Sequence, residues 1–397
     1  MNLANALVSA GHKVILWSTT FYHQEKRHRY IGNRNLEVSP LLEIRLIDSP
    51  GYRRNIGLGR LWDHMILGRN LARELSVEKT CPDVAFVGYP PIETAAVMTR
   101  WLAKRGVPCM VDVKDQWPTI FTDPLPGFLR PIGRLALAPY FHLGGRALRD
   151  ATALAAMADG FLQWAARFAG RSIHSLDRVI PLTVPPADVS AGELNQAGLW
   201  WDNQGVLDDA RPRLCFIGSH SPAFDIDPVL DAARLAHATG QPWQFVLCGD
   251  GPSSSDWRRK AADLSNVCFP GWIDRAKIES LALRSTAALA PYRNSDDFVM
   301  SIPNKVIDAL ALGLPVLTPL RGEVMQLITC SQVGLSYVEG SGQALMDSMT
   351  RLLWDSGLRD QLSVNSLDLF KTRFSFDVVY GGLVRHLEMM ASGELKQ

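Results

Sequence analysis

The chain has 397 residues, which is more than one ordinary hydrophobic core holds and suits two domains of roughly 150–200 residues each. Apolar residues make up 47% and charged residues 20%, a globular balance that argues against disorder. Because 41 basic residues are balanced by 40 acidic ones, the formal charge is +1, and no general affinity for nucleic acid is expected.

The first half alternates predicted helices and strands. Apolar residues recur at helical spacing from Leu3 to Ala10, and Gly11 is a typical helix stop. Strand-like runs follow at 13–18, 43–48, 84–88, 108–113 and 153–157. Helix-like segments lie at 61–76, 92–105 and 131–149. This alternation predicts an α/β domain whose parallel sheet is covered on both faces.

Prolines and glycines interrupt the pattern near residue 181, which predicts an interdomain connection at 186–212. Strands are predicted again at 213–217, 243–248, 266–269, 286–289 and 315–318, and helices at 228–238, 277–284, 303–312 and 376–390. We therefore expect domains at 1–185 and 213–374, with a helix in 375–397 packing back toward the first. Doubly wound domains bind ligands at the carboxyl ends of their strands, so a cleft between the two is expected to hold the chemistry.

The cysteines and the hydropathy of the sequence indicate the cellular compartment in which the protein is expected. Cys109, Cys215, Cys248 and Cys268 lie in apolar, strand-like runs, which predicts buried reduced thiols. The sequence has no clustered Cys and His of the kind that binds zinc, no secretory signal, and no apolar run long enough to span a membrane. We expect a cytoplasmic protein, with peripheral contact at the inner face of the membrane left open.

Two predicted strands of the second half end in glycine. Gly218-Ser219 follows the strand 213–217, and Gly249-Asp250 follows the strand 243–248. A glycine at the carboxyl end of a strand lets the backbone approach a ligand closely, although either glycine also fits a simple turn.

The strongest signal is the helix predicted to begin at Pro303 and stop at Gly313. The free amides near Asn304 and Lys305, the positive end of the helix dipole and the lysine together form a phosphate site. Asp308 shares a face with Lys305 and can accept hydrogen bonds from ribose hydroxyls. The alternative is a surface ion pair within an ordinary helix.

A further turn, Gly322-Glu323, follows the strand 315–318. The glycine frees the backbone there, and the glutamate is predicted to open another helix. Glu323 either contributes to a ligand site or complements the helix dipole.

The order of these motifs resembles the C-terminal half of a family 4 glycosyltransferase of GT-B fold. The matching elements are the strand ending at Gly218, G-D-G-P at 249–252, N-V at 266–267 with G-W at 271–272, A-P-Y at 290–292, and D-A-L-A-L-G-L-P-V at 308–316. They span roughly residues 213–340. The first half resembles the acceptor domain of the family more loosely, through G-H-K-V at 11–14 and D-V-K-D-Q-W-P at 112–118.

The resemblance implies two Rossmann-like domains and retaining transfer from a nucleotide-diphosphate sugar without a required metal or other cofactor. Lys305 would face phosphate and act in catalysis. The substrate-binding positions implied by the motifs are Gly218, Ser219, Gly249, Asp250, Asn304, Asp308, Gly322 and Glu323. The Pro303-x-Lys305 element resembles a subgroup that works in polysaccharide or lipid-linked glycan assembly, which implies a glycan or lipid-linked acceptor.

The chain departs from the family pattern at several positions. The family has two glutamates separated by seven residues, but here the second is Asp308 and the first is Met300, for which Asp296 or Asp297 can substitute if the loop shifts. The basic residues near the first strand of the C-terminal domain are absent, which leaves Lys305 and Arg293 to neutralise a diphosphate. Two alternatives therefore stay open: a nucleotide-sugar epimerase of the same fold, and a catalytically degenerate protein that binds a partner.

The start of the chain also departs from the family, whose fold begins with a strand and a glycine-rich loop before the first helix. Here the sequence begins within that helix. Because the first strand of a doubly wound sheet is central, its absence would leave neighbouring edges unpaired. We hypothesise that the stated start is late or that the chain is a fragment.

Three segments have weaker signals. Asp115 follows the strand 108–113 and is the acceptor-side catalytic candidate, because a carboxylate there can orient or deprotonate a hydroxyl; a loop or N-cap role is equally compatible. Asp225-Ile226-Asp227 has the D-x-D metal pattern, but the following Pro228 favours a helix N-cap. Residues 126–149 mix apolar residues with arginines, which favours a core-facing helix with solvated arginines over one lying on an anionic membrane.

Overall fold

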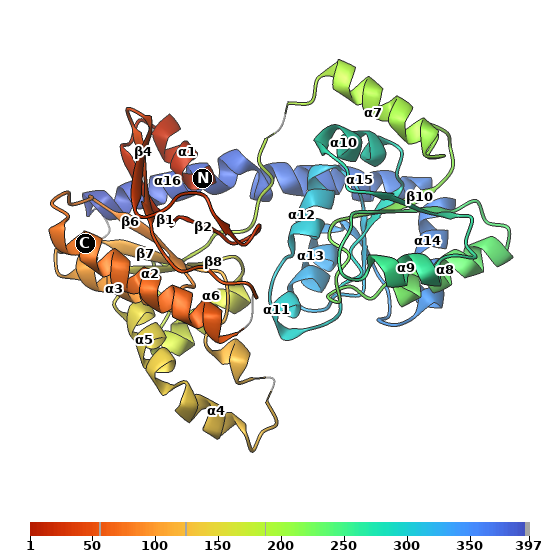
Figure 1. Cartoon of the computed structure of the whole chain (residues 1–397). Helices are drawn as coiled ribbons and strands as arrows, with labels where there is room; N and C mark the ends of the chain where they lie inside the picture. The colour runs from red at the N-terminus through yellow and green to blue at the C-terminus, as the bar shows by residue number, and fades with distance from the viewer. Residues whose placement is uncertain (55–56, 124, 187, 394–397) are drawn as a thin grey trace. The chain divides into compact units, whose positions relative to one another are not determined.

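The computed structural model describes residues 1–54, 57–123, 125–186 and 188–393 (Figure 1). The chain forms two compact units: unit 1 comprises Met1–Pro181 together with the last helix from Tyr380 onward, and unit 2 comprises Leu182–Val379. Both are α/β units, as the alternating sequence pattern predicts. Within the described residues, every helix is too short or too polar to cross a lipid bilayer.

In the described part of unit 1, the strands form three separate groups. Its strands are β1 Val14–Thr19, β2 Phe21–Tyr22, β3 Arg27–His28, β4 Arg34–Ser39, β5 Leu42–Ile47, β6 Ala85–Tyr89, β7 Cys109–Val113, β8 Ala153–Ala156 and β9 Arg178–Val179. One sheet has the order β1-β5-β4, a second has the order β6-β7-β8-β9, and β2 pairs with β3 in a hairpin. Its helices are α1 Asn2–Ser9, α2 Leu58–Val77, α3 Ile92–Ala103, α4 Arg130–Ala136, α5 Ala138–Arg149, α6 Asp159–Ala169 and the C-terminal part of α16 Phe376–Ser392, with a 3-10 turn at Thr119–Phe121.

The prediction of one parallel sheet in this half is wrong in two respects. The strand β4 pairs antiparallel with β5, and sequence reasoning missed it because the strand is mostly exposed and has few apolar residues. In addition, the strands form two sheets: in the described part of the chain, β1 pairs only with β5 and β6 pairs only with β7. The predicted strands themselves are confirmed, with ends within two residues of those observed.

The predicted helix at 131–149 is broken into α4 and α5 at Leu137. Pro139 lies in the first turn of α5 and cannot donate a backbone hydrogen bond to a continuous helix. The two halves are buried very differently. The helix α5 buries Gly144, Gly145, Ala147 and Leu148, which fits a core-facing helix, whereas α4 buries no residue at all.

The last helix, α16, extends the predicted 376–390 by two residues. Hydrogen bonds join it to the rest of unit 1. The His386 Nε2 lies 2.9 Å from the carbonyl oxygen of Leu176, and the His12 Nε2 lies 2.8 Å from the Glu388 carboxylate. The chain end is therefore tied to residues distant in sequence within the same unit.

Unit 2 is a doubly wound domain around a single six-stranded sheet. Its strands are β10 Arg213–Ile217, β11 Gln244–Cys248, β12 Val267–Gly271, β13 Ala287–Leu289, β14 Val316–Thr318 and β15 Gly334–Ser336. The order is β12-β11-β10-β13-β14-β15, and all pairs are parallel. Its helices are α7 Ala191–Asn203, α8 Asp227–Ala238, α9 Ser254–Lys260, α10 Arg275–Leu283, α11 Asp296–Val299, α12 Asn304–Ala311, α13 Glu323–Ser331, α14 Gly342–Trp354 and α15 Ser356–Leu369, followed by a π-helical turn at Phe370–Phe374.

The central strands of unit 2 are buried on both faces, which is why they are continuous apolar runs in the sequence. The thiols of Cys215 and Cys248 lie on these strands, and that of Cys109 lies on β7 of unit 1. All three are buried and unpaired, as predicted, while Cys268 is partly buried.

The predicted irregular connection at 186–212 is wrong for residues 191–203, which form α7. The helix begins with a capping box in which Ser190 and Glu193 satisfy each other's backbone amides, a signal hidden among the surrounding prolines and glycines. The Trp201 indole is fully buried and donates to the carbonyl of Lys277 on α10 at 2.9 Å. This helix is therefore part of unit 2.

Candidate functional site

The candidate site lies at the carboxyl end of β10, where the strand order of unit 2 reverses. The strand β10 lies between β11 and β13, so the chain leaves it toward one side of the sheet and later returns on the other. In open α/β sheets, ligands bind outside the carboxyl ends of the strands at this point. The turns that follow β10 and β11, and the helix α12, supply the candidate residues.

Glycines allow the turns after β10 and β11 to interlock. The Gly218 amide donates to the carbonyl of Cys248 at 3.0 Å, and a Cβ on Gly249 would lie 1.9 Å from the Gly218 carbonyl oxygen. The His220 amide donates to the carbonyl of Asp250 at 3.0 Å. Both Gly218 and Gly249 have positive φ angles, 150° and 122°. The two glycines therefore allow the two backbones to approach closely, which a simple turn would not require.

Lys305, from the first turn of α12, reaches back to the end of β10. Its Nζ donates to the carbonyl oxygen of Ile217 and lies 4.8 Å and 5.3 Å from the ring centres of Phe216 and Phe224. A Cβ on Gly218 would lie only 1.5 Å from that Nζ, so the glycine makes room for the ammonium group. Burial lowers the Lys305 pKa to about 8. The structure therefore brings two sequence-predicted residues into direct contact.

Asp308 lies one helical turn after Lys305, as the spacing predicts. The two side chains line a narrow recess of about 20 Å³ beside the end of β10. The Asp308 side chain is exposed to solvent on one side. Partial desolvation by the surrounding protein raises the pKa of its carboxyl group, and the positive charges of Lys305 and Arg275 oppose this shift. Asn304 is exposed at the first position of α12. This helix start thus presents an amide side chain, an ammonium group and a carboxylate.

A hydrogen-bonded group lies at the turn after β11. Asp250 accepts hydrogen bonds from the Ser254 hydroxyl and the Gly251 amide, which hold the Asp250 pKa below its usual range. The Ser254 hydroxyl also lies 2.9 Å from Nδ1 of the buried His220. The imidazole stacks on Trp257 at 4.3 Å, and burial lowers its pKa. This packing gives His220 a structural role, whereas sequence reasoning missed Ser254, whose only signal is its place in the polar run after Gly251.

Gly322 and Glu323 lie at the start of α13. Gly322 has a φ of 64°, and a Cβ there would lie 2.1 Å from the carbonyl oxygen of Val299. The turn therefore packs directly against the end of α11. Glu323 is the first residue of α13 and is partly buried. Ser219 follows Gly218 in the turn after β10 and is exposed.

The possible replacements for Met300 lie on the short helix α11. Asp296 and Asp297 are exposed in its first turn, and Asp297 accepts a hydrogen bond from Ser295 at 2.6 Å. Met300 itself forms the C-cap of that helix and is partly buried. The two carboxylates thus lie one turn before the family's glutamate position, on a helix rather than a loop.

Arg293, the second predicted cation, is already paired. Its Nη2 donates to Asp225 at 3.1 Å and its Nε to the carbonyl of Pro222 at 3.3 Å. The favoured N-cap role of the D-x-D sequence is wrong, because Ile226 occupies the N-cap position of α8 without a side-chain capping bond. Asp227 is the first helical residue and binds Lys260 at 2.7 Å. Within the described ranges, no group of three or more His, Cys, Asp and Glu side chains has the geometry of a metal site.

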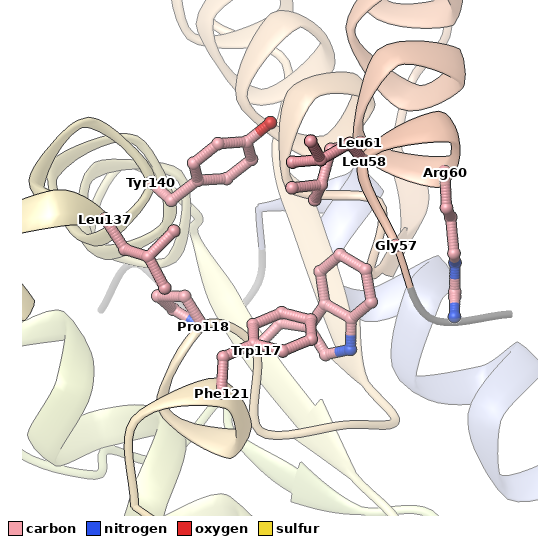
Figure 2. A pocket seen from close by; sticks show the side chains of 9 residues that line it. All are labelled: Gly57, Leu58, Arg60, Leu61, Trp117, Pro118, Phe121, Leu137 and Tyr140. Atoms are coloured by element: carbon pink, nitrogen blue, oxygen red, sulfur yellow. The ribbon is translucent and has the colours of Figure 1, made fainter. Parts of the chain in front are cut away.

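Asp115 belongs to unit 1. It follows β7, is partly buried, and accepts a hydrogen bond from the Gln116 amide at 2.8 Å. The neighbouring Trp117 is buried and lines an apolar cavity of about 290 Å³ (Figure 2). Figure 2 shows Leu58 and Leu61 of α2 and Tyr140 of α5 around the same cavity, with Trp117 below them. Sequence reasoning missed this cavity, because its walls come from three separate segments, at 57–61, 117–121 and 137–140, which only the fold brings together.

Known proteins resemble this chain in sequence and in fold. Residues 211–355, which include all six strands of unit 2, match the family described as Glycosyl transferases group 1. A stretch of 172 residues is 23% identical to an alpha-D-kanosaminyltransferase of Streptomyces kanamyceticus. The matched stretch covers 43% of this chain, and the chain spans 43% of the length of that curated relative.

Solved structures extend the likeness over both units. The sucrose-phosphate synthase of Thermosynechococcus elongatus has a TM-score of 0.67 at 15% identity, with 98% of this chain and 92% of that chain covered. HepE of Anabaena, solved with UDP and glucose, has a TM-score of 0.60 at 16% identity, with 87% and 86% covered. WaaG, a glycosyltransferase of lipopolysaccharide biosynthesis, has a TM-score of 0.59 at 14% identity, with 98% and 94% covered.

At these identities, the structural likeness shows the fold. It is the GT-B fold, with two Rossmann-like domains, as the sequence motifs imply. The family match and the kanosaminyltransferase relative support an enzyme of the glycosyltransferase class.

Proposed function

We propose that the protein is a retaining glycosyltransferase that moves a sugar from a nucleotide-diphosphate sugar to a glycan or lipid-linked acceptor. The observation that carries the proposal is the placement of Lys305. The Gly218 turn seats its ammonium group at the carboxyl end of β10, beside the start of α12. A cation and free helix amides at the switch point of a doubly wound sheet form a site for a diphosphate.

Each residue then has a defined task. Lys305 and the first amides of α12 neutralise the negative charge that develops on the departing nucleotide diphosphate. Asp308, one turn further along α12, accepts hydrogen bonds from the ribose hydroxyls. The interlocked turns at Gly218-Ser219 and Gly249-Asp250 line the diphosphate and the base, and Gly322-Glu323 lies at the sugar. The matched family and the UDP complexes of HepE support a nucleotide-sugar donor.

The acceptor side is assigned to unit 1. Asp115, at the carboxyl end of β7, orients the acceptor hydroxyl or takes its proton. The hydroxyl attacks the sugar from the face that the diphosphate leaves, so the anomeric configuration is retained. In this proposal no metal or other cofactor takes part, because the lysine and the helix amides supply the positive charge. We place the reaction in the cytoplasm, at the inner face of the membrane when the acceptor is lipid-linked.

A donor-conversion experiment tests this function. The purified chain is incubated with UDP-, GDP- and ADP-sugars and a glycan and lipid extract, and released nucleotide and product anomer are measured by NMR. Acceptor-dependent release of one nucleotide diphosphate with retained configuration is expected. Conversion of the donor sugar without an acceptor would instead identify an epimerase.

Met300 is the specific observation in favour of a degenerate binding protein, because its side chain cannot bond a sugar hydroxyl. Binding of a nucleotide sugar without any turnover would support that second function. Restoring the family residue with Met300→Glu would then be expected to raise turnover. A variant that stays inactive while binding the donor would leave the degenerate function as the better interpretation.

A further inference from the structure

An unusual apolar surface lies on unit 1, around the helix α4. Phe128 is 77% exposed, Ile132 is 63% exposed and Leu135 is 78% exposed. Ile132 and Leu135 are three residues apart, so they share one face of the helix. Helices in globular proteins normally bury such a face, but α4 buries no residue. In Figure 1, this helix lies at the edge of unit 1, away from its strands.

The start of α2 also exposes apolar side chains. Leu58 and Trp62 are also largely exposed, and Leu58 lines the 290 Å³ cavity together with Leu137, the residue that ends α4. We call Leu58, Trp62, Phe128, Leu129, Ile132 and Leu135 the α2–α4 patch. An exposed apolar patch of this kind marks a surface that contacts a membrane, another protein or a ligand.

The segment that carries most of the patch is basic. Residues 125–149 contain four arginines and no aspartate or glutamate. Arg130 and Arg134 lie on α4 itself and are exposed. Arg134 has one distant carboxylate neighbour, Asp123, at 3.9 Å, and Arg130 donates only to the Leu125 carbonyl among the contacts of the described residues. Both guanidinium groups are thus available to a negatively charged surface.

We propose that the α2–α4 patch docks on an anionic phospholipid bilayer. The apolar side chains of α4 enter the interface between headgroups and acyl chains, and Arg130 and Arg134 bind the phosphates. A short helix that mixes exposed apolar side chains with arginines, without any acidic residue, fits this environment. This surface lies entirely within unit 1, and the proposal does not require the nucleotide site of unit 2 to function.

The experiment is vesicle flotation with the full chain. The probes are vesicles of phosphatidylglycerol and phosphatidylcholine, and vesicles of phosphatidylcholine alone. The first variant carries Phe128→Ser, Ile132→Ser and Leu135→Ser, and the second carries Arg130→Glu and Arg134→Glu. The control variant carries Leu283→Ser and Trp354→Ser, which remove equally exposed apolar side chains from unit 2.

The wild type and the control are expected to float with the anionic vesicles, at least tenfold more than with the neutral ones. The serine variant should lose this binding, and the glutamate variant should bind about tenfold or more weakly, since each basic residue near an anionic surface contributes about a factor of five. Because α4 buries no residue, both variants should keep the circular dichroism spectrum and melting temperature of the wild type.

Three results would overturn the proposal. The wild type could fail to float, the folded serine variant could float as well as the wild type, or binding could be the same for neutral and anionic vesicles. A wild type that sediments as a dimer and becomes monomeric in the serine variant, without binding vesicles, would identify a second copy as the occupant. Nucleotide binding, measured on the same samples, separates these outcomes from a failure of the proposed function.

Discussion

Replacing Lys305 with methionine separates the stability of unit 2 from its ligand binding. Methionine keeps the apolar stem against Phe216 and Phe224 but removes the ammonium group and its hydrogen bond to Ile217. The Lys305 pKa falls from 10.5 to about 8 because the charged form is buried. At about 1.36 kcal/mol per pKa unit, this places the cost of the buried charge at roughly 1–3 kcal/mol, after allowance for partial exposure.

The sign of the pH dependence follows from the two pKa values. Below pH 8 the lysine is protonated in both the folded and the unfolded chain, so the folded state bears the full cost of the buried charge. Between about pH 8 and 10.5 the unfolded chain holds a proton that the folded one has lost, so the wild type gains stability as the pH rises. The advantage of the Lys305→Met variant should therefore be largest near pH 7 and shrink toward pH 10.

Denaturant unfolding at pH 7.0 and pH 9.5, together with nucleotide titration, measures both effects. Removing the buried charge should gain roughly 1–3 kcal/mol, and removing the hydrogen bond should cost about 1 kcal/mol. We therefore expect the free energy of unfolding of Lys305→Met at pH 7 to equal that of the wild type or exceed it by up to about 2 kcal/mol. The variant should bind no nucleotide. Lys371→Ala, at an exposed position in the same unit, is the matched control and should change neither property. A variant destabilised by more than about 2 kcal/mol, or one that still binds nucleotide, would refute this explanation of the buried lysine.

Four further changes have definite expected outcomes. Gly218→Ala should weaken nucleotide binding at least tenfold, measured by calorimetry, because the added Cβ displaces the Lys305 ammonium; unchanged affinity would contradict the steric role. In the wild type, nucleotide affinity should fall as the pH rises through 8, where Lys305 loses its proton, and a flat profile from pH 7 to 9.5 would count against a phosphate contact. Asp308→Asn should weaken binding of a nucleoside diphosphate but leave pyrophosphate binding unchanged, whereas equal losses would contradict a ribose contact. Asp115→Asn should lower turnover without changing donor affinity, and an unchanged rate would remove Asp115 from the acceptor side.

The sequence predicts the central strands of unit 2 well because they are buried on both faces, but it does not predict β15, α9, α14 or α15. The apolar runs at β10 and β11 leave little ambiguity about their structure, and the Pro303–Gly313 signals locate α12 within one residue at its start. The placement of Lys305 and Asp308 on one face of α12 follows from helical spacing alone. The contact between Lys305 and Gly218 does not, because it joins residues 87 positions apart and depends on the absence of a Cβ.

Other features could not be read from the sequence for physical reasons. The helix α7 lies among prolines and glycines, and the burial of Trp201 and its hydrogen bond to α10 are tertiary contacts that the local pattern does not indicate. The exposure of α4 is a tertiary property: its apolar pattern is the same one that a buried helix has. The cavity beside Trp117 likewise requires the packing of α2 against the segments at 117–121 and 137–140.

Isothermal titration of the wild type and Lys305→Met with UDP, GDP and ADP tests the nucleotide site most directly. One nucleotide should bind the wild type with a stoichiometry of one, and the heat of binding should disappear in the folded Lys305→Met variant. Absence of binding of all three to the folded wild type, or equal binding to both proteins, would contradict a nucleotide-diphosphate site at the junction of β10 and α12.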